Sequence, residues 1–76
     1  MSDSQQRLIR CFEAVFPELS ARYLARASAS SVAAWDSVAT VTLAATVEEA
    51  FGIQLQAEEI EKMDSFQSYL NLLDRR

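Results

Sequence analysis

Apolar residues recur at helical spacing in the first part of this 76-residue chain. Three- and four-residue intervals place one set of them on a single helix face, and that set consists of Leu8, Phe12, Val15 and Phe16. Pro17 disfavours helical geometry at the residue before it. We therefore predict a helix over about residues 3–16.

The segment 37–51 mixes two kinds of residue. Six β-branched side chains favour a strand, namely Val38, Thr40, Val41, Thr42, Thr46 and Val47. Alanines favour a helix, as does an apolar line at four-residue intervals through Leu43, Val47 and Phe51. The segment is also longer than a typical strand. Either Asp36 or Ser37 can cap its start, and Gly52 can end it in a left-handed conformation, so we predict a helix.

Residues 17–36 are predicted to connect these two helices. The run of alanine and serine at 27–31 is typical of a loop, whereas an earlier apolar group is able to form a helical turn: Leu19, Tyr23 and Leu24. Trp35, the single tryptophan, is predicted to anchor the end of this connector against the core.

The C-terminal part predicts two further helices. A short one covers residues 57–63 and turns Ile60 and Met63 inward. A longer one covers residues 65–74, begins at a serine cap, and has a buried stripe of Phe66, Tyr69, Leu70 and Leu73. We therefore expect one all-α domain, residues 1–76, built as a bundle of three longer helices and one short helix.

The composition excludes several functions. Histidine is absent, which removes the commonest general base and transition-metal ligand, so we expect neither an enzyme nor a metal site. No apolar run approaches the ~18 residues of a membrane span, and the N-terminus has no signal-peptide pattern. The single cysteine, Cys11, falls within the first apolar pattern and is predicted to be a packed thiol. We expect a cytoplasmic monomer without membrane contact.

The net charge of -4 is unevenly distributed. Residues 36–64 contain seven acidic side chains and only one basic side chain, Lys62, whereas the first 35 residues are slightly basic. Such an acidic segment repels nucleic acid and favours basic protein surfaces. It is equally the solvated face that keeps a small protein soluble.

The pattern Asp-Ser-apolar occurs twice, at residues 36–38 and 64–66. Both serines lie at predicted helix starts, where capping alone explains most such pairs. Unpaired N–H groups and the helix dipole also make these positions favourable for a phosphodiester. The local pattern therefore permits a phosphate-linked group on Ser37 or Ser65 without choosing between them.

The residues that follow Ser37 distinguish the two motifs. An uninterrupted helical segment comes first, then Val-Glu-Glu-Ala-Phe-Gly-Ile at 47–53, then the acidic Glu-Glu-Ile-Glu-Lys-Met at 58–63. This order resembles the acyl carrier protein family, in which an Asp-Ser-Leu motif precedes a Glu-Glu-x-Phe-Gly-Ile sequence and a short acidic helix. Trp35 before Asp36 is similar to the Trp-Asp-Ser-Leu variant of stand-alone bacterial carriers.

The resemblance implies a carrier that is not itself a catalyst. Ser37 would receive 4'-phosphopantetheine from coenzyme A through a phosphopantetheinyl transferase, with magnesium in that transferase's site. The terminal thiol of the arm would hold an acyl intermediate as a thioester. Asp36 would support the transfer or simply cap the helix. Acyl-activating ligase or synthase enzymes of a biosynthetic pathway would be the other partners.

The resemblance also implies a partner-binding surface. It would contain Val38, Val41, Ala45, Glu48 and Glu49. The helical spacing of the first three also fits a half-buried face, and packing is the simpler interpretation of each one alone.

Two positions depart from the family pattern. Ala39 and Thr42 stand where acidic residues are common, which favours a specialised pathway over general fatty-acid synthesis. Val38 replaces the usual leucine. The alternatives are a peptidyl or aminoacyl carrier, and an unmodified helical module in which Ser37 is only a cap and the acidic segment binds a basic partner.

Overall fold

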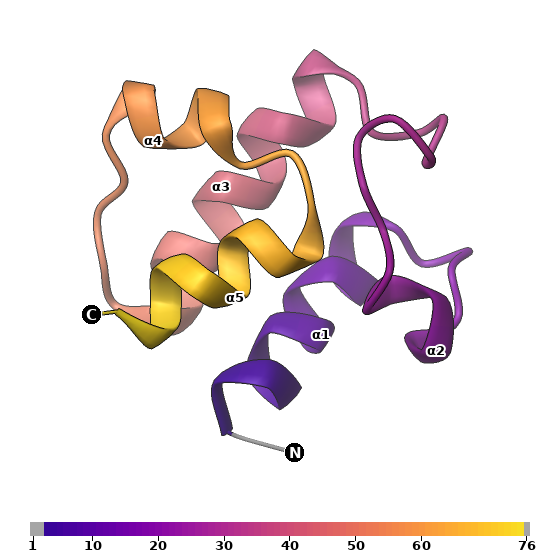
Figure 1. Ribbon diagram of the computed structural model, residues 1–76, viewed down its shortest axis with the longest axis horizontal. Coiled ribbons are helices and arrows are strands. Elements are labelled where there is room, and N and C mark those ends of the chain that lie inside the picture. Colours follow the sequence, from indigo (N-terminus) through magenta and orange to yellow (C-terminus); the bar gives the residue numbers. More distant parts are fainter. Residues whose placement is uncertain (1–2, 76) are drawn as a thin grey trace.

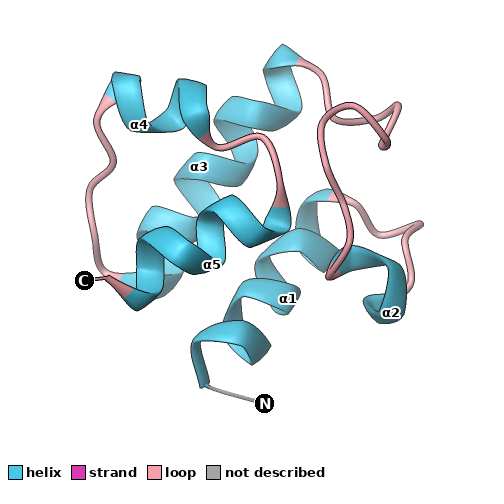
Figure 2. Cartoon of the chain, in the orientation of Figure 1, coloured by secondary structure: helices cyan, strands magenta, loops and turns pink. Residues whose placement is uncertain are grey.

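The computed structural model of the protein describes residues 3–75, apart from the side chain of Ala21. Within this part of the chain it contains five helices and no strand (Figures 1 and 2). Their bounds are α1 Asp3–Val15, α2 Ala21–Leu24, α3 Ser37–Phe51, α4 Ala57–Lys62 and α5 Phe66–Asp74. The predicted all-α bundle is confirmed, and the four predicted helices match α1, α3, α4 and α5 with ends that differ by one residue at most.

The predicted connector 17–36 is not entirely a loop, because it contains the four-residue helix α2. Ser20 has an extended backbone and its hydroxyl accepts a hydrogen bond from the N–H of Tyr23 at 3.3 Å, which caps this helix. The sequence pattern allowed a helical turn here. The sequence pattern does not identify Ser20 as a cap, because a single helical turn shows no apolar periodicity of its own.

The rest of the connector is held against the start of α5. The N–H of Ala29 donates to the carbonyl of Asp64 at 2.8 Å, and the N–H of Phe66 donates to the carbonyl of Ala27 at 3.0 Å. These two bonds form an isolated antiparallel bridge between Ser28 and Ser65. The segment 27–31, for which the sequence predicts a loop, is therefore bonded to the start of α5, nearly forty residues later in the chain.

Helix α1 packs against α2, α3 and α5, while α4 packs on α3 (Figure 1). The ring of Phe12 is fully buried and contacts four other aromatic rings. The distances between ring centroids are 5.1 Å to Phe66, 5.5 Å to Trp35, 5.9 Å to Tyr69 and 6.1 Å to Phe16. The predicted anchoring of Trp35 is confirmed, since only 6% of it is exposed.

The end of α3 is fixed from two sides. Gly52 adopts the predicted left-handed conformation, with φ 64°, and its N–H donates to the carbonyl of Glu48. The Arg7 guanidinium of α1 donates to the carbonyl of Ala50 and lies 4.7 Å above the ring of Phe51. A cation near the C-terminal end of a helix is stabilising there because it faces the negative end of the helix dipole.

The apolar stripe of α5 differs from the prediction at one position. Phe66, Tyr69 and Leu73 are buried as predicted, but Leu72 is buried in place of Leu70, which is half-buried. Ile60 of α4 is half-buried against the core, and Met63, which directly follows this helix, is buried. Leu70 lies three residues before Leu73 and Leu72 lies three residues after Tyr69, so helical spacing alone allows either leucine to be buried.

Tyr69 is an unusual member of the core. Its side chain is fully buried, and its hydroxyl has no hydrogen-bond partner among the described residues. Burial raises the pKa of Tyr69 to about 12, with smaller contributions from the negative charges of Glu48 and of ionised Cys11. The unfolded chain ionises at about pH 10. The native state therefore holds its proton more tightly, and this contribution to stability is lost as pH rises from about 10 to about 12.

We expect Tyr69→Phe to remove this alkaline loss, which is of order 2 kcal/mol. At pH 7 the variant should unfold within about 1 kcal/mol of the wild type, because the deleted hydroxyl has no partner. The measurement is urea denaturation at pH 7 and across pH 9–12. Tyr23→Phe, at a half-exposed tyrosine, should keep the wild-type alkaline slope; the same slope in Tyr69→Phe would contradict the assignment.

Candidate functional site

The start of α3 is built by Asp36. This residue has an extended backbone, and its Oδ1 accepts a hydrogen bond from the N–H of Ala39 at 2.9 Å. Its carbonyl accepts two more, from the N–H and from the hydroxyl of Thr40, each at 2.9 Å. Of the two residues that the sequence allowed as the cap, Asp36 is therefore the one that performs it.

Ser37 is consequently the first residue of the helix and is not needed for capping. Its side chain is exposed, and its hydroxyl has no hydrogen-bond partner among residues 3–75. The N–H groups of Ser37 and Val38 also make no hydrogen bond to this part of the chain. Free N–H groups at a helix start and the positive end of the helix dipole favour a negative group there. The Ser37 hydroxyl is thus accessible and lies where a phosphate ester is electrostatically favourable.

The second Asp-Ser pair is arranged differently, and its serine is already occupied. Ser65 is itself the cap of α5: its hydroxyl accepts from the N–H of Ser68 at 3.0 Å and lies 2.8 Å from the Ser68 hydroxyl. Ser65 is also half-buried and belongs to the bridge with Ser28. Two motifs with the same local sequence therefore differ in which residue caps the helix.

An apolar surface follows Ser37 along α3. Val38 is 71% exposed and Val41 is 65% exposed, and Ala45 and Glu49 are exposed as well. The interpretation of Val38, Val41 and Ala45 as a half-buried packing face is wrong. The core side of α3 is instead formed by Ala39, Leu43, Ala44 and Val47. We call the exposed residues Val38, Val41, Ala45 and Glu49 the α3 surface.

Glu48 does not share this exposure. It is half-buried, and its Oε2 accepts a hydrogen bond from the N–H of Leu55 at 2.7 Å, which holds the loop after α3 against the helix. Glu49, its neighbour, is exposed. The two glutamates that the sequence placed together as partner-binding residues therefore point to different environments.

The two residues that depart from the family pattern, Ala39 and Thr42, have different environments. Ala39 is 8% exposed and belongs to the core, so it says nothing about the surface charge near Ser37. Thr42 is exposed, and its hydroxyl donates to the carbonyl of Val38 at 3.0 Å. Thr40 and Thr46 bond in the same way to the carbonyl four residues earlier, so these hydroxyls are accommodated within the helix.

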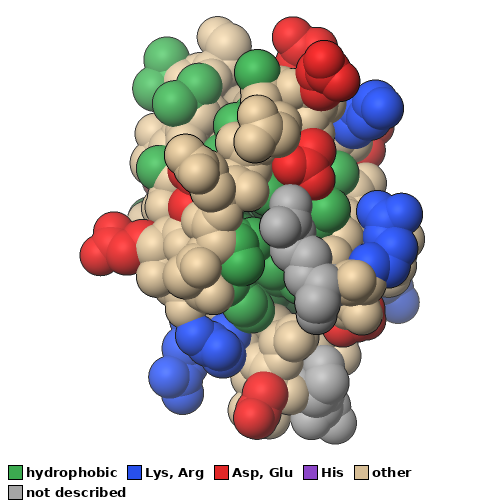
Figure 3. Space-filling model, turned by 90° about the vertical axis from the view of Figure 1, so that its left-hand side faces the viewer, with side chains coloured by type: hydrophobic (Ala, Val, Ile, Leu, Met, Phe, Trp, Pro, Cys, Tyr) green, Lys and Arg blue, Asp and Glu red, His purple; other side chains and the backbone are tan. Residues whose placement is uncertain are grey.

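Charges do not form one acidic face on the side of the molecule where α4 lies. Figure 3 shows acidic side chains at separate points there, with apolar and basic side chains between them. Among the described residues, no group of three or more Cys, Asp or Glu side chains gathers closely enough to hold a metal ion. None of the helices they form has the length and apolar content of a membrane span.

Cys11 is the other side chain with nucleophilic chemistry. It is 4% exposed and its Sγ lies 4.0 Å from the carbonyl of Thr46, so the predicted packed thiol is confirmed. Burial raises the pKa of the Cys11 thiol, an effect that the positive charge of Arg7 partly offsets. A buried thiol that resists ionisation is a poor nucleophile.

Sequence reasoning missed Phe16 as a residue that supports the site. Its ring packs against Trp35 at a centroid distance of 5.6 Å, and Trp35 directly precedes the Asp36 cap. The start of α3 is thereby attached to the end of α1. Pro17 predicts only that the helix ends near Phe16. Nothing in the sequence pairs Phe16 with a residue nineteen positions later.

Comparison of the chain with protein-family models, with curated proteins and with solved structures found no match. The site is therefore interpreted from its own geometry.

The different caps predict different costs of substitution. Asp36→Ala and Ser65→Ala should each lower the free energy of unfolding by about 1 kcal/mol, because each removes a cap. Ser37→Ala should change it by less than about 0.5 kcal/mol, because the hydroxyl has no partner. Urea denaturation followed by circular dichroism measures all three. A loss for Ser37→Ala equal to that for Ser65→Ala would show that Ser37 also caps its helix.

Proposed function

We propose that this protein is a carrier that holds acyl intermediates as thioesters on a 4'-phosphopantetheine arm attached to Ser37. The observation that carries the proposal is the exposed, unpartnered Ser37 hydroxyl on the first residue of a helix whose cap is supplied by its neighbour. An attachment residue must offer its oxygen to another enzyme and must not be part of the fold's own hydrogen bonding. Ser37 meets both conditions.

The residues around Ser37 fit the group. In the attachment reaction, Oγ of Ser37 bonds to the phosphorus of the coenzyme A diphosphate that carries the pantetheine, 3',5'-ADP leaves, and the hydroxyl proton passes to the transferase or to solvent. The resulting phosphodiester is negative and lies beside the free N–H groups at the start of α3. When bound, the arm supplies the thiol on which cargo is carried.

Asp36 has a second role compatible with its cap. The cap uses only Oδ1, and Asp36 is exposed, so Oδ2 is accessible from outside. Carboxylate oxygens are the ligands that magnesium prefers in proteins. Asp36 would then orient Ser37 through the cap and offer its other oxygen to the magnesium in the transferase's site.

The α3 surface supports the partner part of the proposal. Two valines that are mostly exposed, a few residues after Ser37, form an apolar patch on which a transferase, ligase or synthase can close while it reaches the serine. Thr42 leaves this surface without an acidic group at that position. This favours partners of a dedicated pathway over those of general fatty-acid synthesis. A non-modified interaction module would use the same exposed valines but would leave Ser37 unaltered.

The attachment is tested by intact mass. The protein is incubated with coenzyme A, magnesium and a broad-specificity phosphopantetheinyl transferase. The wild type and Ser65→Ala should each gain the mass of one 4'-phosphopantetheine group, and Ser37→Ala should gain none. No gain in the wild type, or a gain that persists in Ser37→Ala, rules out the carrier as proposed and leaves the interaction module.

The α3 surface is tested by Val41→Ala. Removing most of an exposed apolar side chain from a contact with the transferase should lower kcat/KM for modification by roughly tenfold, from ~1–1.5 kcal/mol of lost apolar burial. The unfolding free energy should not fall, because Val41 is exposed and alanine has the higher helix propensity. Gln67→Ala, at an exposed position of α5, is the matched control. Equal rates for both variants would exclude Val41 from the contact.

A further inference from the structure

A hollow of about 300 Å³ lies between α1 and α3. On the α1 side it is lined by Arg7, Arg10 and Cys11, and on the α3 side by Thr46 and Ala50. The two arginines are exposed, whereas the cysteine is buried. The charged groups at this junction of the two helices are therefore two guanidiniums. We call it the α1/α3 hollow.

The fold does not neutralise these two positive charges. Among residues 3–75, Arg10 makes no hydrogen bond or ion pair. Arg7 donates to the carbonyl of Ala50 and lies 4.7 Å above the ring of Phe51, and neither of these groups carries a negative charge. Arg7 is thus held in place by its contacts, and both guanidiniums keep their charge for a group from outside.

The α1/α3 hollow continues the α3 surface. Its two lining residues from α3, Thr46 and Ala50, directly follow Ala45 and Glu49 of that surface. Val41 lies five residues before Thr46, which is about 7.5 Å along a helix axis. The exposed valines and the two arginines therefore belong to one face that spans two helices, with the apolar part nearer Ser37 and the basic part nearer the end of α3.

Few acidic groups oppose this basic part. Thr42 is uncharged, and the carboxylate of Glu48 is used within the fold, where it accepts from the N–H of Leu55 at 2.7 Å. Glu49 is the exposed acidic residue of the α3 surface. Asp36 is also exposed but lies at the opposite end of α3. Two guanidiniums thus face one nearby carboxylate of the same surface.

We propose that this face binds a partner protein through an amphipathic acidic segment. Apolar side chains of the segment cover Val38 and Val41, and its carboxylates pair with Arg7 and Arg10, because guanidinium groups match carboxylates in geometry and charge. The inference rests on the proposed function for the use of the α3 surface by partners, and it adds the charge of the partner. It requires no arm on Ser37. The charge is opposite to that of the basic partner expected from the acidic segment of the sequence.

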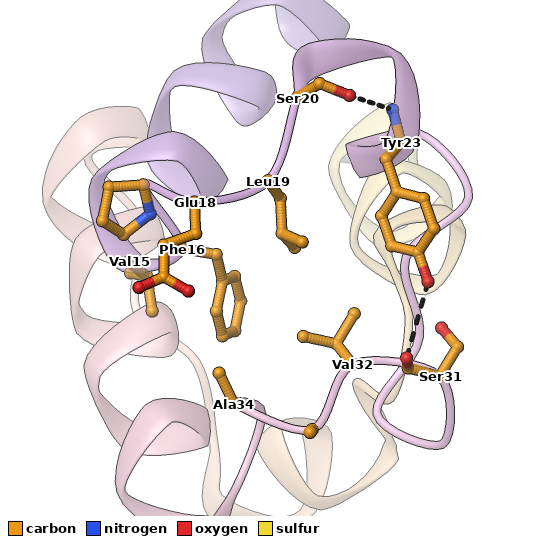
Figure 4. A pocket seen from close by; sticks show the side chains of 11 residues that line it. Val15, Phe16, Glu18, Leu19, Ser20, Tyr23, Ser31, Val32 and Ala34 are labelled. Carbon is orange, nitrogen blue, oxygen red and sulfur yellow. Dashed lines mark hydrogen bonds between the residues drawn. The ribbon is translucent and has the colours of Figure 1, made fainter.

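A second hollow favours the opposite charge, which makes the assignment testable. It has a volume of about 690 Å³ and lies between the end of α1, α2 and the connector. Figure 4 shows Phe16, Leu19 and Val32 pointing into this space, and its one charged lining residue is Glu18. Phe16 packs against Trp35 with 5.6 Å between the ring centroids, so Trp35 emission reports on occupancy of this second hollow.

The probes are three fluorescein-labelled amphipathic peptides of about 18 residues, a length that permits helix formation. They share one leucine face and differ only in the flanking residues, which are Glu, Gln or Lys. Anisotropy titrations of the unmodified protein at about 20 mM salt should show the Glu peptide binding at least threefold more tightly than the Lys peptide. The difference should shrink at about 0.5 M salt, where charges are screened. Val41→Ala should weaken the binding of all three.

Arg10→Glu should reverse the order of the Glu and Lys peptides. Arg22→Glu is the matched control, since it changes the net charge equally at an exposed position of α2 that lines neither hollow, and it should keep the Glu peptide the tighter ligand. An acidic preference that survives Arg10→Glu overturns the assignment. So does the absence of saturable binding, or equal binding of the Glu and Lys peptides.

Tighter binding of the Lys peptide also overturns the proposal, and a change in Trp35 emission that Glu18→Gln abolishes would place that peptide in the second hollow. Ser37→Ala should show the wild-type preference, which separates this test from the attachment test. A protein that accepts the arm without preferring the Glu peptide keeps the carrier function and loses the acidic partner. A protein that prefers the Glu peptide but refuses the arm keeps the interface and loses the carrier function.

Discussion

The ring of Phe12 holds much of the fold together, because it contacts aromatic rings at the end of α1, at the end of the connector and in α5. Phe16 directly follows the helix that carries Phe12, Trp35 ends the connector, and Phe66 and Tyr69 belong to α5. A domain of this size buries a modest fraction of its surface, so a few large side chains supply much of its apolar burial. The start of α3 takes its position from this cluster through Trp35.

The candidate site depends on the different roles of two adjacent residues, Asp36 and Ser37. The side chain of Asp36 accepts the hydrogen bond from the N–H of Ala39 and caps the helix. The Ser37 hydroxyl is therefore not needed for any hydrogen bond of the fold. At the second motif the serine caps the helix and has no such freedom. The availability of the hydroxyl therefore follows from which of the two side chains caps the helix, and the local sequence does not decide that choice.

The connector positions the start of α3. Its pairing with the start of α5 fixes Ala27 and Ala29, and the hydrogen bond from Tyr23 to Ser31 joins α2 to the connector. The same segment then delivers Trp35 to the core and Asp36 to the start of α3.

Periodicity, caps and helix stops in the sequence were sufficient for the all-α class, for four of the five helices and for the burial of Cys11, because these depend on neighbours along the chain. The tertiary structure decided the rest. It exposed Val38 and Val41 and buried Ala39. It bonded Glu48 to the backbone of the following loop while Glu49 stayed exposed, and it packed Phe16 against Trp35. A helix with apolar residues on every side has no preferred face of its own, so only packing against α1 could select the face that stays in water.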